Sequence, residues 1–78
     1  MNELYYDTVH RIYYNGHKAV GYVDDNGICH CGRVSHINRL KVAHQGEVQM
    51  YMPTQIIQGS YLYQPFTDKI SELLYTNR

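Results

Sequence analysis

The first half of the chain consists of short apolar and aromatic runs that two turn signals separate. Asn15-Gly16 divides the first two runs, and Asp24-Asp25-Asn26-Gly27 divides the second from the third. Asn-Gly pairs readily supply the positive φ that a tight hairpin turn needs. The pattern predicts an antiparallel meander of three strands, near residues 5–14, 18–23 and 28–34.

The middle of the chain predicts two further strands joined by a turn at Ala43-His44-Gln45-Gly46. The run before this turn carries the apolar residues Ile37, Leu40 and Val42. The run after it carries apolar residues at every second position, which are Val48, Met50 and Met52. A period of two is typical of a strand with one buried face. Pro53 is expected to end this strand, because proline donates no ladder hydrogen bond.

The last segment predicts a loop or irregular strand over residues 54–64, followed by a helix. Pro65 precedes the expected start, Thr67 can cap it, and the apolar stripe consists of Ile70, Leu73 and Leu74. The predicted fold is one α+β domain over residues 1–78. It has an antiparallel sheet of about five strands with one C-terminal helix packed on it.

Composition limits the classes of function. Seven Lys and Arg balance seven Asp and Glu, so the formal net charge is zero. This balance argues against a protein that binds nucleic acid simply through a strongly positive surface. A chain of 78 residues has a thin core that a metal ion or a second subunit would supplement. The chain also lacks the features of a membrane or secreted protein. The sequence contains no apolar run long enough to cross a membrane and no signal-peptide pattern. We expect a cytoplasmic protein with no membrane partner.

The run Cys29-His30-Cys31 suggests metal binding, because thiolate and imidazole are the ligands that zinc prefers. Neighbours on a strand point to opposite faces, so Cys29 and Cys31 share one face and His30 takes the other. One metal model therefore combines the two cysteines with His36 or His44. The bound ion would be zinc or another divalent transition metal with a structural role.

A second metal model uses the register of the two hairpins. If both turns are symmetric two-residue turns, Gly21 lies opposite His10 on one side and opposite His30 on the other. The two imidazoles would then flank a bare glycine on one face of the sheet. The alternative to both models is that the cysteines are small buried groups and the histidines are ordinary surface residues.

The tyrosines are the second group of candidate functional residues. The chain has nine Tyr but one Phe and no Trp, which is an unusual proportion. Tyrosine is enriched where proteins bind proteins, although some of these side chains can form cross-strand pairs or a homodimer interface. The candidate partner-binding residues are Tyr51, Tyr61, Tyr63, Arg39 and Lys41.

The sequence carries little that indicates catalysis. Asp24 and Asp25 lie in a predicted turn, where aspartate is a common turn former. The chain has no Gly-rich phosphate loop, and a strand in so small a domain offers little pocket for Cys29 and a nearby histidine. We expect a protein that is not an enzyme.

Several short segments together resemble the stage V sporulation protein G (SpoVG) family. They are Arg11-Ile12, Gly16-His17-Lys18-Ala19-Val20, His36-Ile37-Asn38-Arg39-Leu40-Lys41-Val42 and Met50-Tyr51-Met52-Pro53. The resemblance implies a strand at residues 36–42, a strand ending in Met-Pro and a terminal helix over Pro65 to Tyr75. It also implies a dimeric regulator that binds DNA or RNA.

The chain departs from that family directly after Met52-Pro53. Family members carry a basic cluster and a basic loop there, but this chain reads Thr54-Gln55-Ile56-Ile57-Gln58 and has no Lys or Arg between Lys41 and Lys69. The bases that remain for a modest patch are Arg11, Lys18, Arg33, Arg39 and Lys41, and nucleic acid would be bound near the last three of them.

Two functional hypotheses follow. The first is a small non-catalytic inhibitor, encoded by a phage or mobile element, that binds a host or defence-system protein. In size and character it is similar to anti-CRISPR proteins that block a type II effector nuclease. The alternative is a SpoVG-like dimeric regulator that binds DNA or RNA.

Overall fold

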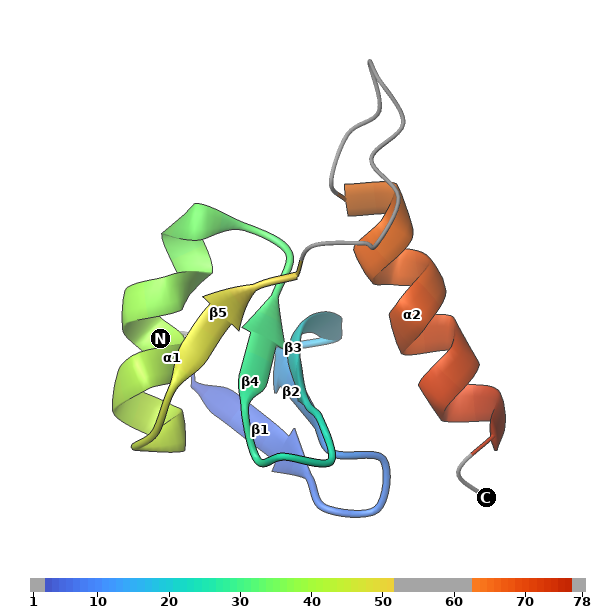
Figure 1. Ribbon diagram of the computed structural model, residues 1–78, viewed down its shortest axis with the longest axis horizontal. Helices are drawn as coiled ribbons and strands as arrows, with labels where there is room; N and C mark the ends of the chain where they lie inside the picture. Colours follow the sequence, from blue (N-terminus) through green and yellow to red (C-terminus); the bar gives the residue numbers. More distant parts are fainter. Residues whose placement is uncertain (1–2, 52–62, 77–78) are drawn as a thin grey trace.

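The computed structural model describes residues 3–51 and 63–76 and shows an α+β fold with a five-stranded sheet (Figure 1). The strands are β1 (Leu4–Asp7), β2 (Ile12–Asn15), β3 (Lys18–Val23), β4 (Cys29–Cys31) and β5 (Val48–Met50). The helices are the 3-10 turn η1 (Val34–His36), α1 (Ile37–His44) and α2 (Tyr63–Thr76). The prediction of a sheet of about five strands with a C-terminal helix is confirmed.

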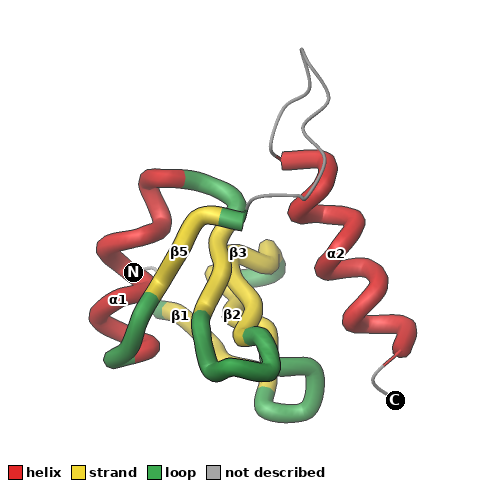
Figure 2. Tube along the Cα trace, viewed as in Figure 1, coloured by secondary structure: helices red, strands yellow, loops and turns green. Residues whose placement is uncertain are grey.

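The sheet lies between the two α-helices, as Figures 1 and 2 show from the same side. On one face, Leu40 of α1 packs against a cluster of sheet residues, which are Tyr13, Val20, Cys29, Cys31 and Val48. On the other face, Phe66 and Ile70 of α2 pack against Ile12 and Tyr22. Each side of the sheet thus depends on one helix for its burial.

The strands follow one another in the order β1-β2-β3-β4-β5. The pairs β2–β3 and β3–β4 are antiparallel, as predicted, and β1–β2 is a further antiparallel pair, but β4 and β5 are parallel. This difference arises because α1 crosses between these two strands and returns the chain in its original direction.

The segment at residues 36–42 was predicted as a strand, and that prediction is wrong: Ile37–His44 is the helix α1. The prediction relied on the two-residue spacing of Leu40 and Val42. The three-residue spacing of Ile37 and Leu40 fits a helix, and Leu40 is the residue of α1 that is buried. The helix ends where Gln45 adopts a left-handed conformation at φ 57°.

The predicted strand 5–14 is interrupted by a turn and forms β1 and β2. Arg11 has a φ of 62°, and its amide donates to the Asp7 carbonyl oxygen at 2.7 Å. His10 therefore lies in a turn and not on a strand.

Both hairpins have a register that differs from the predicted one. The first turn centres on Gly16 and His17, with Gly16 at φ 67°, and Asn15 pairs with Lys18. A bulge then makes Val20 an extra residue, so that Gly21 lies opposite Tyr13. In the second hairpin Gly21 lies opposite Cys31. The predicted placement of Gly21 between His10 and His30 is wrong.

Helix α2 confirms the predicted apolar stripe in part. Phe66 and Ile70 are buried and Leu73 packs beside them, whereas Leu74 is 39% exposed. The helix begins at Tyr63 and not near Thr67, and it includes Pro65 in its first turn, where a missing amide costs no helical hydrogen bond. The predictions for Met52, Pro53 and most of the loop 54–64 concern residues outside those that the structure describes.

Candidate functional site

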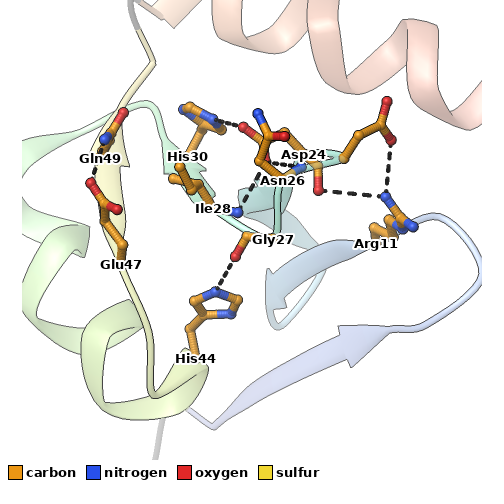
Figure 3. Close-up of polar contacts among 10 residues, drawn as sticks. Arg11, Asp24, Asn26, Gly27, Ile28, His30, His44, Glu47 and Gln49 are labelled. Atoms are coloured by element: carbon orange, nitrogen blue, oxygen red, sulfur yellow. Dashed lines mark hydrogen bonds and ion pairs between the residues drawn. The ribbon is translucent and has the colours of Figure 1, made fainter.

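The turn between β3 and β4 is organised by Asp24. Its Oδ1 accepts hydrogen bonds from the Asn26 and Ile28 amides, both at 2.9 Å, and its Oδ2 lies 2.7 Å from His30 Nε2 (Figure 3). The bond from His30 and those from the two amides hold the pKa of Asp24 below its ordinary value, against a smaller opposing effect of burial. One carboxylate thus joins the turn to the strand that follows it.

Asp7 has the same arrangement in the turn between β1 and β2. Its Oδ1 accepts from the Val9 amide at 3.0 Å and from the His10 amide at 3.3 Å, and its Oδ2 lies 2.7 Å from His10 Nδ1. His10 and His30 therefore each bond an aspartate of their own hairpin. The metal model that joined these two histidines loses the register on which it rested.

Cys29 and Cys31 share one face of β4, and both side chains are fully buried. Burial raises the pKa of the Cys29 thiol to about 12, with further contributions from Cys31 and Asp24, and burial also raises the pKa of Cys31. The Cys31 Sγ lies 3.3 Å from the Arg33 carbonyl oxygen, to which the thiol donates. Burial thus favours the neutral thiol at both positions, and a metal ion bound here would have to displace the thiol protons.

His44 links the end of α1 to two other parts of the fold. Its Nε2 lies 3.0 Å from the Gly27 carbonyl oxygen, which can only accept, so this nitrogen carries the proton (Figure 3). Its Nδ1 accepts from the Tyr13 hydroxyl at 3.2 Å. Both ring nitrogens of His44 thus have partners within the protein.

The six predicted metal ligands are distributed over the turn between β1 and β2, strand β4, η1 and the end of α1. Across residues 3–51 and 63–76, the structure brings no three His, Cys, Asp or Glu side chains together as a metal site. The binding of a structural zinc or similar ion therefore stays a prediction. Elemental analysis of the purified protein tests it by measuring whether a metal is bound.

A hollow of about 660 Å³ lies beside His30, between the sheet and α2. The Tyr22 ring stacks on His30 with 5.1 Å between centroids, and Lys69 Nζ lies 5.9 Å from the Tyr22 ring centre. At the rim, Arg11 Nη1 lies 3.1 Å from Asp25 Oδ1. Burial raises the pKa of Tyr22, so its hydroxyl stays protonated and is a poor nucleophile. These groups hold the hairpin and the helix together.

The predicted partner-binding residues separate into buried, exposed and undescribed ones. Tyr51 is half-buried beneath α2, with its ring centroid 5.9 Å from that of Tyr22 and 6.1 Å from that of Phe66. Arg39 and Lys41 are exposed on α1. Tyr61 and the side chain of Tyr63 lie outside the described residues.

We call the exposed surface that runs from Arg33, which precedes η1, through η1 into α1 the η1–α1 face. Its residues are Arg33, Val34, Arg39, Lys41 and Val42. Val34 is 71% exposed and Val42 is 78% exposed, although the sequence analysis placed Val42 among the apolar positions of a strand. A helical periodicity over residues 37–44 would have placed Val42 opposite Leu40. All five residues of the η1–α1 face lie within a stretch, residues 26–46, that contains no Asp or Glu.

Comparisons with known proteins gave no match, either to a family model, to a curated protein or to a solved structure. Within the part of the chain that the structure describes, no helix is both long and apolar enough to span a bilayer.

Proposed function

We propose that the protein is a small non-catalytic inhibitor that binds another protein through the η1–α1 face. The observation that supports this proposal is the exposure of two valines, Val34 of η1 and Val42 of α1, together with the exposed side chains of Arg39 and Lys41 on α1. Exposed apolar side chains framed by polar ones mark contact surfaces, and arginine is enriched among the residues that contribute most to binding.

We propose further that the partner is a host or defence-system protein in the cytoplasm, namely the effector nuclease of a type II CRISPR system, and that a phage or mobile element encodes the inhibitor. The support for this step is the small single domain of 78 residues, similar in size and character to anti-CRISPR proteins.

A second candidate function is that of a SpoVG-like dimeric regulator that binds DNA or RNA. The observation in its favour is the separation of charge along the chain, because residues 26–46 contain Arg33, Arg39 and Lys41 and no acidic residue. Clustered Lys and Arg provide the affinity for phosphate even when the net charge of a protein is zero.

An inhibition assay tests the first proposal. We expect the purified protein to block target cleavage by a type II effector nuclease loaded with guide RNA. The double variant Arg39→Glu/Val42→Ser removes an arginine and an apolar contact from the interface. We therefore expect its concentration at half-inhibition to be at least about tenfold higher than that of the wild type. The variant Thr8→Asp/Asn26→Asp is the control: it changes the net charge equally at two exposed turn positions, and should inhibit like the wild type.

Equal inhibition by both double variants would contradict the proposed face. A salt-dependent gel shift with plain DNA or RNA, with cleavage unaffected, would instead support the regulator and exclude the inhibitor.

A further inference from the structure

The side chains of two cysteines and a methionine lie together on the α1 side of the sheet, where β4 and β5 run side by side (Figure 1). Cys29 and Cys31 share one face of β4, and Met50 of β5 pairs with Cys31 in the parallel register. The Cys31 Sγ lies 3.9 Å from the Met50 Sδ. Both cysteines belong to the buried cluster that includes Leu40, and Met50 packs against that cluster. We call Cys29, Cys31 and Met50 the sulfur cluster.

The distance between the Cys31 and Met50 sulfurs is that between two ligands of one metal ion. Metal–sulfur bonds of about 2.3 Å that meet at about 120° place their sulfur atoms about 4.0 Å apart. Cys29 and Cys31 are two strand positions apart, so their Cα atoms are separated by about 6.6 Å. Their side chains point to the same face, and a lean of about 1.3 Å by each brings the two sulfurs to the distance that one ion needs.

The chemistry of the three sulfurs selects the kind of ion. A thiolate together with a thioether is a soft ligand set of the type that binds copper(I). Structural zinc takes four ligands from cysteine, histidine and carboxylate side chains. His44 does not supply a further ligand here, because both of its ring nitrogens have partners within the protein. Two thiolates and one thioether therefore fit copper(I) better than zinc.

We propose that the sulfur cluster binds one copper(I) ion, with Cys29 and Cys31 as thiolate ligands and Met50 as a thioether ligand. Each thiol loses its proton to solvent as its metal–sulfur bond forms, and no atom changes its oxidation state. The bound site carries one net negative charge, which the two thiolates share. The proposal goes beyond the inhibitor function, because the site lies in the core and needs no partner protein. It differs from the predicted zinc site in its ion and in the use of methionine in place of histidine.

The end of the sheet offers the ion a way in. β5 is the terminal strand of the five-stranded sheet and has three residues. Met50 is half-buried, whereas the two cysteines are fully buried, so the thioether is the ligand nearest to solvent. Short terminal strands open locally at a lower free energy than the centre of a sheet. Local opening of β5 therefore exposes the two thiols without unfolding the chain.

The experiment is an anaerobic titration of the full, reduced protein with copper(I), in competition with a copper(I) chelator of known affinity. We expect one ion per chain and a near-ultraviolet charge-transfer band from thiolate to copper. Silver(I) has the same charge and preference for sulfur, and it should bind with the same stoichiometry and raise the melting temperature. Failure of the wild type to bind either ion would overturn the proposal.

Two conservative variants test the methionine ligand. Met50→Leu keeps the apolar volume but removes the thioether, so it should weaken copper(I) binding at least about tenfold. Ile37→Leu is the matched control, because it makes an equally small change at another residue packed against the same buried cluster, and its affinity should stay within about twofold of the wild type. Equal affinities for the two variants would contradict the three-sulfur site.

The double variant Cys29→Ala/Cys31→Ala tests the thiolate ligands. It should bind no copper(I) in competition with the chelator, and stoichiometric binding by this variant would overturn the proposal. Zinc(II) is titrated separately: zinc bound at one ion per chain, with no copper(I) bound, would support the predicted zinc site in place of this one. None of these results bears on nuclease inhibition, which Met50→Leu should retain.

Discussion

Leu40→Ala is expected to lower the free energy of unfolding by about 3 kcal/mol, the range found for buried leucines whose removal leaves a cavity. Leu40 is fully buried and packs against Cys29, Cys31 and Val48 on the α1 side of the sheet. A chain of this size has a total stability of only about 4–12 kcal/mol. The loss should appear as a lower denaturation midpoint with an unchanged m value.

Val42→Ala is the matched control, and it also tests the conformation of the segment. Residues 40 and 42 share a face on a strand, but on a helix they lie about 200° apart. Because Val42 is 78% exposed, its replacement should change stability by less than about 0.5 kcal/mol. Similar losses for the two variants would contradict the helix α1.

Asp24→Ala is expected to cost about 2–3 kcal/mol, because it removes three hydrogen bonds at once and leaves the His30 ring without its carboxylate. Asp24→Asn keeps an oxygen for the two amides, so it should cost about half as much. Asp25→Ala is the control, since Asp25 makes an exposed ion pair with Arg11 and should contribute less than about 0.5 kcal/mol. Urea denaturation of the three variants measures these differences, and equal losses for Asp24→Ala and Asp25→Ala would contradict the account.

The contribution of Asp24 should also depend on pH. Its pKa in the folded state is below the ordinary value of 3.8, so the carboxylate stabilises the fold above that value and the stabilisation is lost as the pH falls through the lowered pKa. The difference in stability between the wild type and Asp24→Ala should therefore be constant above about pH 5 and shrink toward about pH 2. A difference that stays constant down to about pH 2 would show that the carboxylate charge is not involved.

The sequence predicted those parts of the fold that local patterns determine. The hairpin around Gly16, the alternation that places Cys29 and Cys31 on one face, and the stripe of Ile70 and Leu73 all depend on nearby residues. The helix α1 was missed because Ile37, Leu40 and Val42 fit two periodicities. Packing of Leu40 on the sheet decides between them, and this contact is not visible in the sequence.

The candidate sites depended on register, which local patterns do not determine. In the first hairpin, the turn centred on Gly16 and His17 and the extra residue Val20 together bring Tyr13, and not His10, opposite Gly21. In the second hairpin, the longer turn after Val23 shifts the pairing by one residue. A shift of one residue reverses the face that a side chain occupies, and here it places Cys31 in place of His30 opposite Gly21. The hydrogen bonds of His10 and His30 to Asp7 and Asp24 follow spacings of three and six residues, and a search for Asx turns would have found the aspartates.

The central claim, that the η1–α1 face binds a protein, is tested most directly by hydrogen–deuterium exchange of the chain alone and bound to the guide-loaded effector nuclease. We expect slower exchange across residues 33–44, with exchange in the turn at residues 24–28 unchanged. Slower exchange confined to α2 or to the hairpin turns, with residues 33–44 unchanged, would contradict it.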